Sequence, residues 1–405
     1  MKIHIVIGKN FGDEGKGLAT DYFAHSAQKE GIPCLVIRHN GGAQAGHTVE
    51  MPGKRFVFHQ LASGSFRDAD TLWADTFLPD LYKLGEEIEA FSALSGLAPR
   101  IWAFPQCRCV LIDDVLINMA LEESRGNRRH GSCGMGINEA VERSGSAHFA
   151  LRLEDAAGRS CDSLAARMLE LRGSYTLRRL EELSLSMDQM GEYGELLRNP
   201  LVIRNAAEVM CRAAEKIKLA EPDAAELEHW GEIVFEGAQG LLLDAENTEY
   251  APYLTPSRTG MHNPGAFCKM HFASIKPEAV YVSRTYVTRH GAGPLPYEDR
   301  FSPEDYGIRD MTNAPNPWQG RLRFAPHGDF SRFFVPIWAD VRESVCPVKT
   351  SLLLTHCNET NGKIVFAEGQ QDIDRFARKA VEEGTAETVY FSASKYAHEI
   401  TKYGS

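Results

Sequence analysis

Short apolar runs alternate with longer amphipathic segments along the chain. Five runs rich in β-branched residues and leucine predict buried strands, near residues 5, 35, 234, 282 and 353. Continuous apolar runs of this kind are typical of a parallel sheet covered on both faces. Residues 77–91 and 201–220 instead have apolar positions at three- and four-residue spacing, which predicts helices. The pattern therefore predicts an α/β fold with a mostly parallel central sheet flanked by helices.

One long stretch, residues 151–228, has almost wholly helical character. We interpret it as a large helical insertion in the α/β fold. No internal repeat or low-complexity segment divides the sequence, so we expect one domain over residues 1–405 that carries this insertion. Residues 313–324 are rich in proline and asparagine and predict an irregular loop.

Composition narrows the classes of partner. The formal net charge of −11 argues against a nucleic acid polymer, because an acidic surface repels phosphate backbones, but a local basic pocket can still hold a nucleotide. No apolar run approaches the roughly 20 residues needed to cross a bilayer, and the first ten residues fit a buried strand better than a signal peptide. Nine scattered cysteines, an odd number, indicate reduced thiols, so we expect a cytoplasmic protein without membrane contact.

A glycine-rich loop follows the first predicted strand, at residues 8–17. It precedes a helical segment, so backbone N–H groups and the helix N-terminus would face a bound anion. Lys16 is placed to neutralise phosphate oxygens, although Gly17 stands where a P-loop carries a hydroxyl for magnesium. Asp13 and Glu14 lie inside the loop, and acids there are repulsive unless they hold a metal or move a proton. The simpler alternative is a glycine turn capped by Asp13.

A second loop of small residues, at 40–48, follows the strand near residue 35 and contains His47. Ligands of α/β proteins bind at the carboxyl ends of strands, where a histidine can donate a proton or hydrogen bond to a developing oxyanion. A lone histidine is more often a structural residue. The pattern alone leaves both interpretations open.

Four motifs together resemble those of the adenylosuccinate synthetase family. They are G-D-E-G-K-G at 12–17, N-G-G-x-x-A-G-H-T at 40–48, F-E-G-A-Q-G-x-L-L-D at 235–244 and T-R-x-G-A-G-P-x-P at 288–296. The resemblance covers nearly the whole chain and is thinnest in the helical insertion and the C-terminal third. It implies a ligase that forms a C–N bond: a nucleoside triphosphate, usually GTP, phosphorylates the 6-oxygen of IMP, and L-aspartate then displaces the phosphate. It also implies Mg²⁺ as cofactor and a homodimer.

The resemblance assigns roles in the two glycine-rich loops. Asp13 would remove the N1 proton of the purine nucleotide and ligate Mg²⁺, with the Gly46 carbonyl as a second ligand. His47 would stabilise charge on the phosphoryl oxygens, and Lys16 would bind phosphate. Gln44 stands where the family usually has asparagine. The further nucleotide- or phosphate-binding positions expected in these loops are Gly12, Glu14, Gly15, Gly17, Gln44, Ala45 and Thr48.

Other matched positions lie outside these loops. Gln239 would contact the base or its pocket and Thr255 the 5′-phosphate. Arg321 and Arg323 match the family's G-R-x-R, and two arginines at this spacing suit a carboxylate and a phosphate or ribose. Arg143 is the candidate for the arginine that reaches the partner's nucleotide in the family's homodimer. An ordinary exposed helix arginine is the alternative.

Three regions depart from the family pattern. Trp318 and Gln319 stand where threonines receive the aspartate carboxylate. Ser132 is the nearest hydroxyl to the family's phosphate-binding threonine. Asn358 replaces the aspartate that binds guanine, and the neighbouring base-binding segment is altered around Ser392. An asparagine donates as well as accepts, so it suits guanine less well than other bases.

These departures leave three hypotheses. The first is a synthetase that joins aspartate to IMP. The second keeps the chemistry but uses a 2-aminopurine nucleotide such as (d)GMP or a different amino acid, with ATP as donor. The third is a nucleotide-binding regulatory protein without turnover, which the presence of Asp13, Lys16 and His47 argues against.

Overall fold

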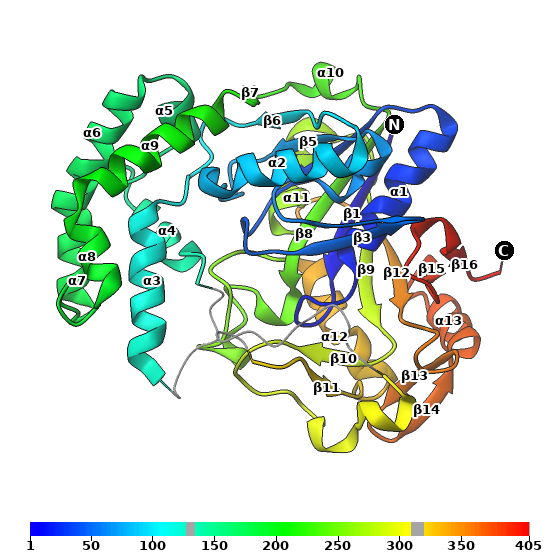
Figure 1. Cartoon of the computed structure of the whole chain (residues 1–405). Helices are drawn as coiled ribbons and strands as arrows, with labels where there is room; N and C mark the ends of the chain where they lie inside the picture. The colour runs from blue at the N-terminus through cyan, green and yellow to red at the C-terminus, as the bar shows by residue number, and fades with distance from the viewer. Residues whose placement is uncertain (127–133, 309–319, 405) are drawn as a thin grey trace.

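A computed structural model of the chain describes residues 1–126, 134–308 and 320–404. Its centre is a ten-stranded sheet in the order β16-β15-β12-β9-β1-β8-β2-β5-β6-β7 (Figure 1). All neighbouring strands pair in parallel except β15 and β16. The strands, in chain order, are β1 Lys2–Gly8, β2 Cys34–Arg38, β5 Asp70–Trp73, β6 Ile101–Ala103, β7 Ile217–Leu219, β8 Glu232–Gly240, β9 Glu278–Arg284, β12 Lys349–Thr355, β15 Thr388–Phe391 and β16 Thr401–Lys402. The predicted fold class is confirmed.

Helices cover both faces of this sheet, as its apolar strands require. Val6 of β1 packs with α1 (Lys16–Glu30), whereas its neighbours Ile5 and Ile7 belong to a core with helices of the opposite face. These opposite helices are α11 (His262–His271), α12 (Phe330–Glu343) and α13 (Ile373–Glu382). Successive side chains of a strand point to opposite faces, so a strand buried on both sides is apolar at most of its positions.

The helical region is larger than predicted from residues 151–228. It already begins with α3 (Ile112–Arg125) and α4 (Ile137–Ser144), and Figure 1 shows these beside α5 to α9 on one side of the sheet. The other helices of this region are α5 Leu153–Ala157, α6 Cys161–Leu171, α7 Leu177–Glu182, α8 Glu192–Arg198 and α9 Pro200–Ala214. Residues 201–220 are not one helix, because the chain leaves α9 and forms the edge strand β7, before the short α10 (Ala224–Leu227).

Three two-stranded antiparallel sheets and one further helix belong to the described part of the chain. The small sheets pair β3 (His47–Met51) with β4 (Lys54–Phe58), β10 (Val287–Arg289) with β11 (Arg323–Ala325), and β13 (Lys363–Phe366) with β14 (Gly369–Asp372). The helix is α2 (Leu81–Ser95), whose apolar side packs in a core shared with α6 and α9. None of the helices within the described ranges has both the length and the apolar character that crossing a membrane requires.

A histidine joins three strands at the amino edge of the sheet. His4 of β1 places Nε2 3.0 Å from Glu232 of β8 and Nδ1 2.8 Å from Glu278 of β9. Burial alone would lower the pKa of His4, but hydrogen bonds and charges from these two carboxylates raise it above its ordinary value. Since the folded protein binds this proton more tightly than the unfolded chain, the cluster stabilises the fold when His4 is charged.

We expect His4→Gln to lower the free energy of unfolding more at pH 6 than at pH 9. The stabilisation from charged His4 is fully present below the unfolded pKa of about 6.5 and is lost as the pH rises through the raised folded pKa. Urea unfolding of both proteins at the two pH values measures the difference, with the exposed His229→Gln as control. An equal loss of stability at both pH values would contradict a charged His4.

Candidate active site

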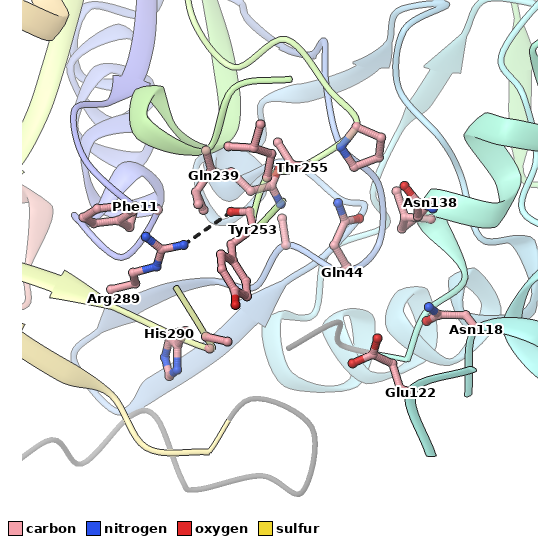
Figure 2. Close-up of a pocket in the computed structure, with 18 of the residues that line it drawn as sticks. Phe11, Gln44, Asn118, Glu122, Asn138, Gln239, Tyr253, Thr255, Arg289 and His290 are labelled. Carbon is pink, nitrogen blue, oxygen red and sulfur yellow. Dashed lines mark hydrogen bonds between the residues drawn. The ribbon is translucent and has the colours of Figure 1, made fainter. Parts of the chain in front are cut away.

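A cavity of about 350 Å³ lies at the carboxyl edge of the sheet. Loops that follow β1, β2 and β8 line it, because parallel strands bring their carboxyl ends to the same edge. The segment after β10, outside the parallel sheet, also contributes. The opposite wall comes from α3 and α4, and Figure 2 shows Asn118, Glu122 and Asn138 there, across from Gln239 and His290. The predicted site residues that line the cavity are Gly12, Asp13, Gln44, Ala45, Gly46, His47, Gln239 and Thr255.

The first glycine-rich loop is held together by one of its own acids. Glu14 is buried and accepts hydrogen bonds from the backbone N–H of Asn10 at 3.0 Å and of Gly12 at 2.8 Å. Gly12 has a φ of 114° and Gly15 a φ of 97°, values at which any other residue would be strained. Glu14 thus shapes the turn and occupies two N–H groups that the sequence had assigned to an anion.

Lys16 lies beneath the loop. Its ammonium donates to the Gly12 carbonyl at 2.5 Å and to Glu14 at 3.2 Å, and the residue is only 2% exposed. Lys16 and Glu14 are therefore next to the cavity without lining it. Asp13, by contrast, points into the cavity, and its side chain is 27% exposed.

Asp13 faces a histidine for which the sequence predicted no role. Nε2 of His290 lies 3.6 Å from Oδ2 of Asp13, slightly beyond hydrogen-bonding distance. His290 occupies the variable position of the T-R-x-G-A-G-P motif. The position in the motif was visible in the sequence, but the contact with Asp13 required the fold.

The second loop is fixed to the neighbouring strand and carries His47 into the cavity. The Asn40 amide donates to the Ala238 carbonyl at 3.0 Å and accepts from the Ala238 N–H at 2.8 Å, which ties the loop to β8. His47 is buried, and burial lowers its pKa to about 4 even though Glu236 lies nearby. In this structure its imidazole is therefore neutral at neutral pH. Thr48 pairs with Val57 in the β3–β4 ladder and is not among the residues that line the cavity.

Two glutamine side chains approach one another at the floor of the cavity. A Cβ on Gly41 would lie 3.2 Å from the amide of Gln44 and 3.2 Å from that of Gln239. The side-chain carbonyl oxygens of both glutamines are buried and accept no hydrogen bond from the rest of the described chain. Buried amides in a polar cavity suit the edge of a nucleobase, which carries donors and acceptors in one plane.

Arg289 is a second cavity residue that the sequence did not single out. It stacks over Phe11 at 4.5 Å and donates to the carbonyls of Pro294 at 2.6 Å and Tyr253 at 3.3 Å (Figure 2). Burial lowers its pKa to about 10, so the guanidinium stays charged at neutral pH. Its charge makes this side of the cavity suitable for an anion.

Arg143 was expected on a helix face from which it reaches a partner subunit or solvent, and this expectation is wrong. Its guanidinium pairs with Asp114 at 2.8 Å and donates to the carbonyls of Cys109 and Phe149, each at 2.8 Å. The residue is 1% exposed. Arg143 therefore joins α3 and α4 inside its own chain instead of standing on an exposed face where it could reach a partner.

The remaining predicted residues lie outside the cavity or outside the described ranges. Arg321 is exposed, whereas Arg323 is held by Glu298 at 2.8 Å and the Gly293 carbonyl at 2.8 Å. Asn358 and Ser392 follow β12 and β15, and a hydrogen bond of 3.0 Å from the Cys357 N–H to the Ser392 carbonyl brings their segments together. Ser132, Trp318 and Gln319 lie outside the described residues.

The fold and the cavity together define a class of protein. A parallel α/β sheet with glycine-rich loops, an acid and a histidine at its carboxyl edge is typical of proteins that bind and transform phosphorylated ligands. The family model for adenylosuccinate synthetase matches residues 5–314. The chain therefore belongs to the adenylosuccinate synthetase family.

Relatives in sequence carry the same family name. Adenylosuccinate synthetases of Pseudomonas fluorescens and Pseudomonas aeruginosa are 29% and 30% identical over 312 residues, 73% of this chain. That of Shewanella piezotolerans is 29% identical over 313 residues. The aligned part spans only 64% of the length of each of these relatives.

Solved structures share the fold over the whole chain. The fully ligated adenylosuccinate synthetase of Plasmodium falciparum superposes with a TM-score of 0.70 at 16% identity, covering 99% of both chains. Succinoaminodeoxyadenylate synthetase of cyanophage S-2L, bound to dGMP and dATP, gives a TM-score of 0.62 at 15% identity, covering 100% of this chain and 96% of that one.

Proposed function

We propose that the chain is a purine nucleotide–amino acid ligase. It phosphorylates the 6-oxygen of IMP with a nucleoside triphosphate, and the amine of aspartate then displaces the phosphate to give adenylosuccinate. The observation that carries the proposal is that Asp13, His47, Gln239 and Thr255, from separate segments of the chain, line one cavity. A protein that only binds nucleotide needs no acid and histidine together, so the cavity supports turnover.

In the proposed reaction Asp13 takes the N1 proton of the purine, which places negative charge on the 6-oxygen. This oxygen attacks the γ-phosphorus of the triphosphate, the bond to the β–γ bridging oxygen breaks, and the diphosphate leaves. The aspartate amine then attacks C6, inorganic phosphate leaves, and the amine loses a proton. His47 binds the phosphoryl oxygens, and the protein contributes chiefly by positioning the reactants and stabilising charge.

The residues present also fit Mg²⁺, the cofactor that the family implies. The Asp13 carboxylate is partly exposed in the cavity and Gly46, also exposed, lines the same wall. Carboxylate and carbonyl oxygens are the ligands that this ion prefers. When bound, Mg²⁺ would neutralise charge on the donor's phosphates. Asp13 and Gly46 would hold it.

A second candidate keeps this chemistry on a 2-aminopurine nucleotide such as dGMP, with ATP as the donor. Asn358 favours it, because an asparagine lacks the matched carboxylate contact with guanine and the donor site then has no reason to prefer GTP. The cyanophage protein of the same fold is bound to dGMP and dATP.

A substrate screen tests the proposal. IMP, dIMP, GMP and dGMP are each combined with aspartate, Mg²⁺ and GTP or ATP, and phosphate release and product mass are followed. We expect release that requires IMP, aspartate and donor together, with adenylosuccinate as product. Turnover with dGMP but not with IMP would support the second candidate. Nucleotide binding without any turnover would contradict both candidates.

The donor preference is expected to be weak or reversed, since Asn358 replaces a guanine-binding acid. Restoring the acid with Asn358→Asp should raise the ratio of kcat/KM for GTP over ATP by about 5- to 150-fold, the equivalent of roughly 1–3 kcal/mol for one matched polar contact. Asn358 is exposed, so the variant should fold normally. A wild-type preference for GTP of about a hundredfold would mean that other residues bind the guanine.

The proposal extends to organisation and location. We propose that residues 1–405 act as one domain, that the protein functions as a homodimer and that it works in the cytoplasm. Free thiols at eight cysteines among the described residues are compatible with a reducing compartment. Size-exclusion chromatography with light scattering tests the dimer, and a monomeric active enzyme would contradict it.

A further inference from the structure

A buried carboxylate stands directly behind His47. Oε1 of Glu236, in β8, lies 2.6 Å from Nδ1 of His47. The same carboxylate accepts a hydrogen bond of 3.1 Å from the Ser63 N–H and a very short one from the Ser63 hydroxyl. Glu236 is fully buried, so these contacts are shielded from water.

The base of the His47 side chain lies close to α1. A Cβ on Gly17, at the start of α1, would lie 2.9 Å from the Cβ of His47, closer than two carbon atoms approach. Gly17 is thus required for α1 to pass this close to the histidine. The Cβ of His47 therefore lies against α1, and its Nδ1 faces β8.

The charge of Glu236 is maintained by its neighbours. Arg38 of β2 is buried, and its Nε lies 4.0 Å from Oε2 of Glu236. Burial alone would raise the pKa of Glu236, but its interactions with the His47 imidazole, the charge of Arg38 and a hydrogen bond from Ser63 lower it to about 2. Glu236 is therefore an anion, and an ionised carboxylate can only accept hydrogen bonds.

An acceptor at 2.6 Å decides which ring nitrogen of His47 carries hydrogen. Nδ1 must donate to Glu236, so Nε2 is the nitrogen left for a ligand in the cavity. We propose that Glu236 is the positioning residue of this site, which fixes the tautomer and orientation of His47 so that Nε2 faces the phosphoryl group. The expected effect of Glu236 on turnover rests on the function proposed above.

The sheet contains a matched control at its opposite edge. Glu278 is likewise a largely buried glutamate in a central strand, 2.8 Å from a histidine nitrogen of His4 and 2.6 Å from the hydroxyl of Ser351. Glu278→Gln and Glu236→Gln disturb the same kind of cluster. Only the second lies behind His47.

The first measurement needs no variant at position 236. Long-range ¹H–¹⁵N correlation spectra of the wild-type protein, with the His47 signals identified by their loss in His47→Asn, report which ring nitrogen is protonated. We expect hydrogen on Nδ1. A bare Nδ1 with hydrogen on Nε2 would overturn the proposal whether or not the protein has synthetase activity.

The second measurement compares kinetics. In Glu236→Gln an NH₂ group replaces one carboxylate oxygen, so either the Ser63 N–H or the pair formed by His47 Nδ1 and the Ser63 hydroxyl loses its acceptor. The negative charge behind His47 is lost as well. We expect kcat to fall by roughly 10²–10⁴-fold, as for other histidines whose orienting acid is made neutral. Nucleotide binding by calorimetry should change less than about threefold, because the amide keeps the shape of the acid.

Glu278→Gln should keep kcat within about twofold of the wild-type value. It should lower the melting temperature about as much as Glu236→Gln does. If both variants lose kcat equally, Glu236 has only a structural role and the proposal is wrong. If the wild-type protein shows no turnover, the function proposed above fails, and the protonation of His47 still decides the role of Glu236.

Discussion

Asp13→Ala is expected to abolish turnover while the fold remains intact. Asp13 would act as the base that removes the N1 proton, and general-base catalysis contributes about 10²–10⁴-fold. Its side chain is partly exposed in the cavity, with Nε2 of His290 3.6 Å away, so its loss leaves no buried group unpaired. The loop is held instead by the Asp13 carbonyl, which accepts from Arg284 at 2.6 Å and is kept in the variant.

Initial rates of phosphate release with IMP, aspartate and donor measure this effect. The isosteric Asp13→Asn should be equally inactive, and Asp299→Asn, an exposed acid on the β10–β11 side of the chain, is the control. Circular dichroism and the urea midpoint should match the wild-type protein. If Asp13→Ala retains more than about a tenth of the rate, another residue is the base, and His290 would be the first candidate.

The sequence predicted the centre of the sheet because its strands are buried on both faces. A run such as Ile3 to Ile7 can satisfy two apolar layers only as a central strand. The apolar run near residue 282 was harder to interpret. This run forms two strands, β9 and β10. After β9 the Thr285 N–H bonds to the Thr355 carbonyl, and the chain then leaves the sheet as β10. Nothing in the hydrophobicity of the run indicates this break.

In the candidate site, too, the sequence predicted some of the residues and missed others. Motifs located the residues that follow strands, because strand ends of a parallel sheet meet at one edge. They did not indicate the wall formed by α3 and α4, with Asn118, Glu122 and Asn138, since that wall depends on how the helical region folds back against the sheet. The partner of a buried charge, such as Glu236 for His47, is likewise set by packing between distant segments.

Arg143 allows the effect of packing between distant segments to be measured, because its partner Asp114 lies 29 positions away in the sequence. Both side chains are 1% exposed, and Arg143→Ala would leave a buried carboxylate without its counter-charge. Breaking a buried ion pair from one side costs about 3–5 kcal/mol. We expect a loss of this size in the free energy of unfolding, measured by urea denaturation. A contact with a partner subunit's nucleotide would instead leave stability unchanged and raise KM.

Two further variants separate these outcomes. Arg159→Ala removes an exposed pair with Asp155 in the same helical region and should cost less than about 1 kcal/mol. Arg143→Met combined with Asp114→Asn removes the uncompensated charge while an amide oxygen can still accept from the Leu111 N–H. This double variant should recover part of the stability lost in Arg143→Ala, because the largest penalty there is an unpaired buried anion. If Arg143→Ala is as stable as Arg159→Ala and only its KM for the nucleotide rises, Arg143 acts at a nucleotide site and the buried pair has no structural role.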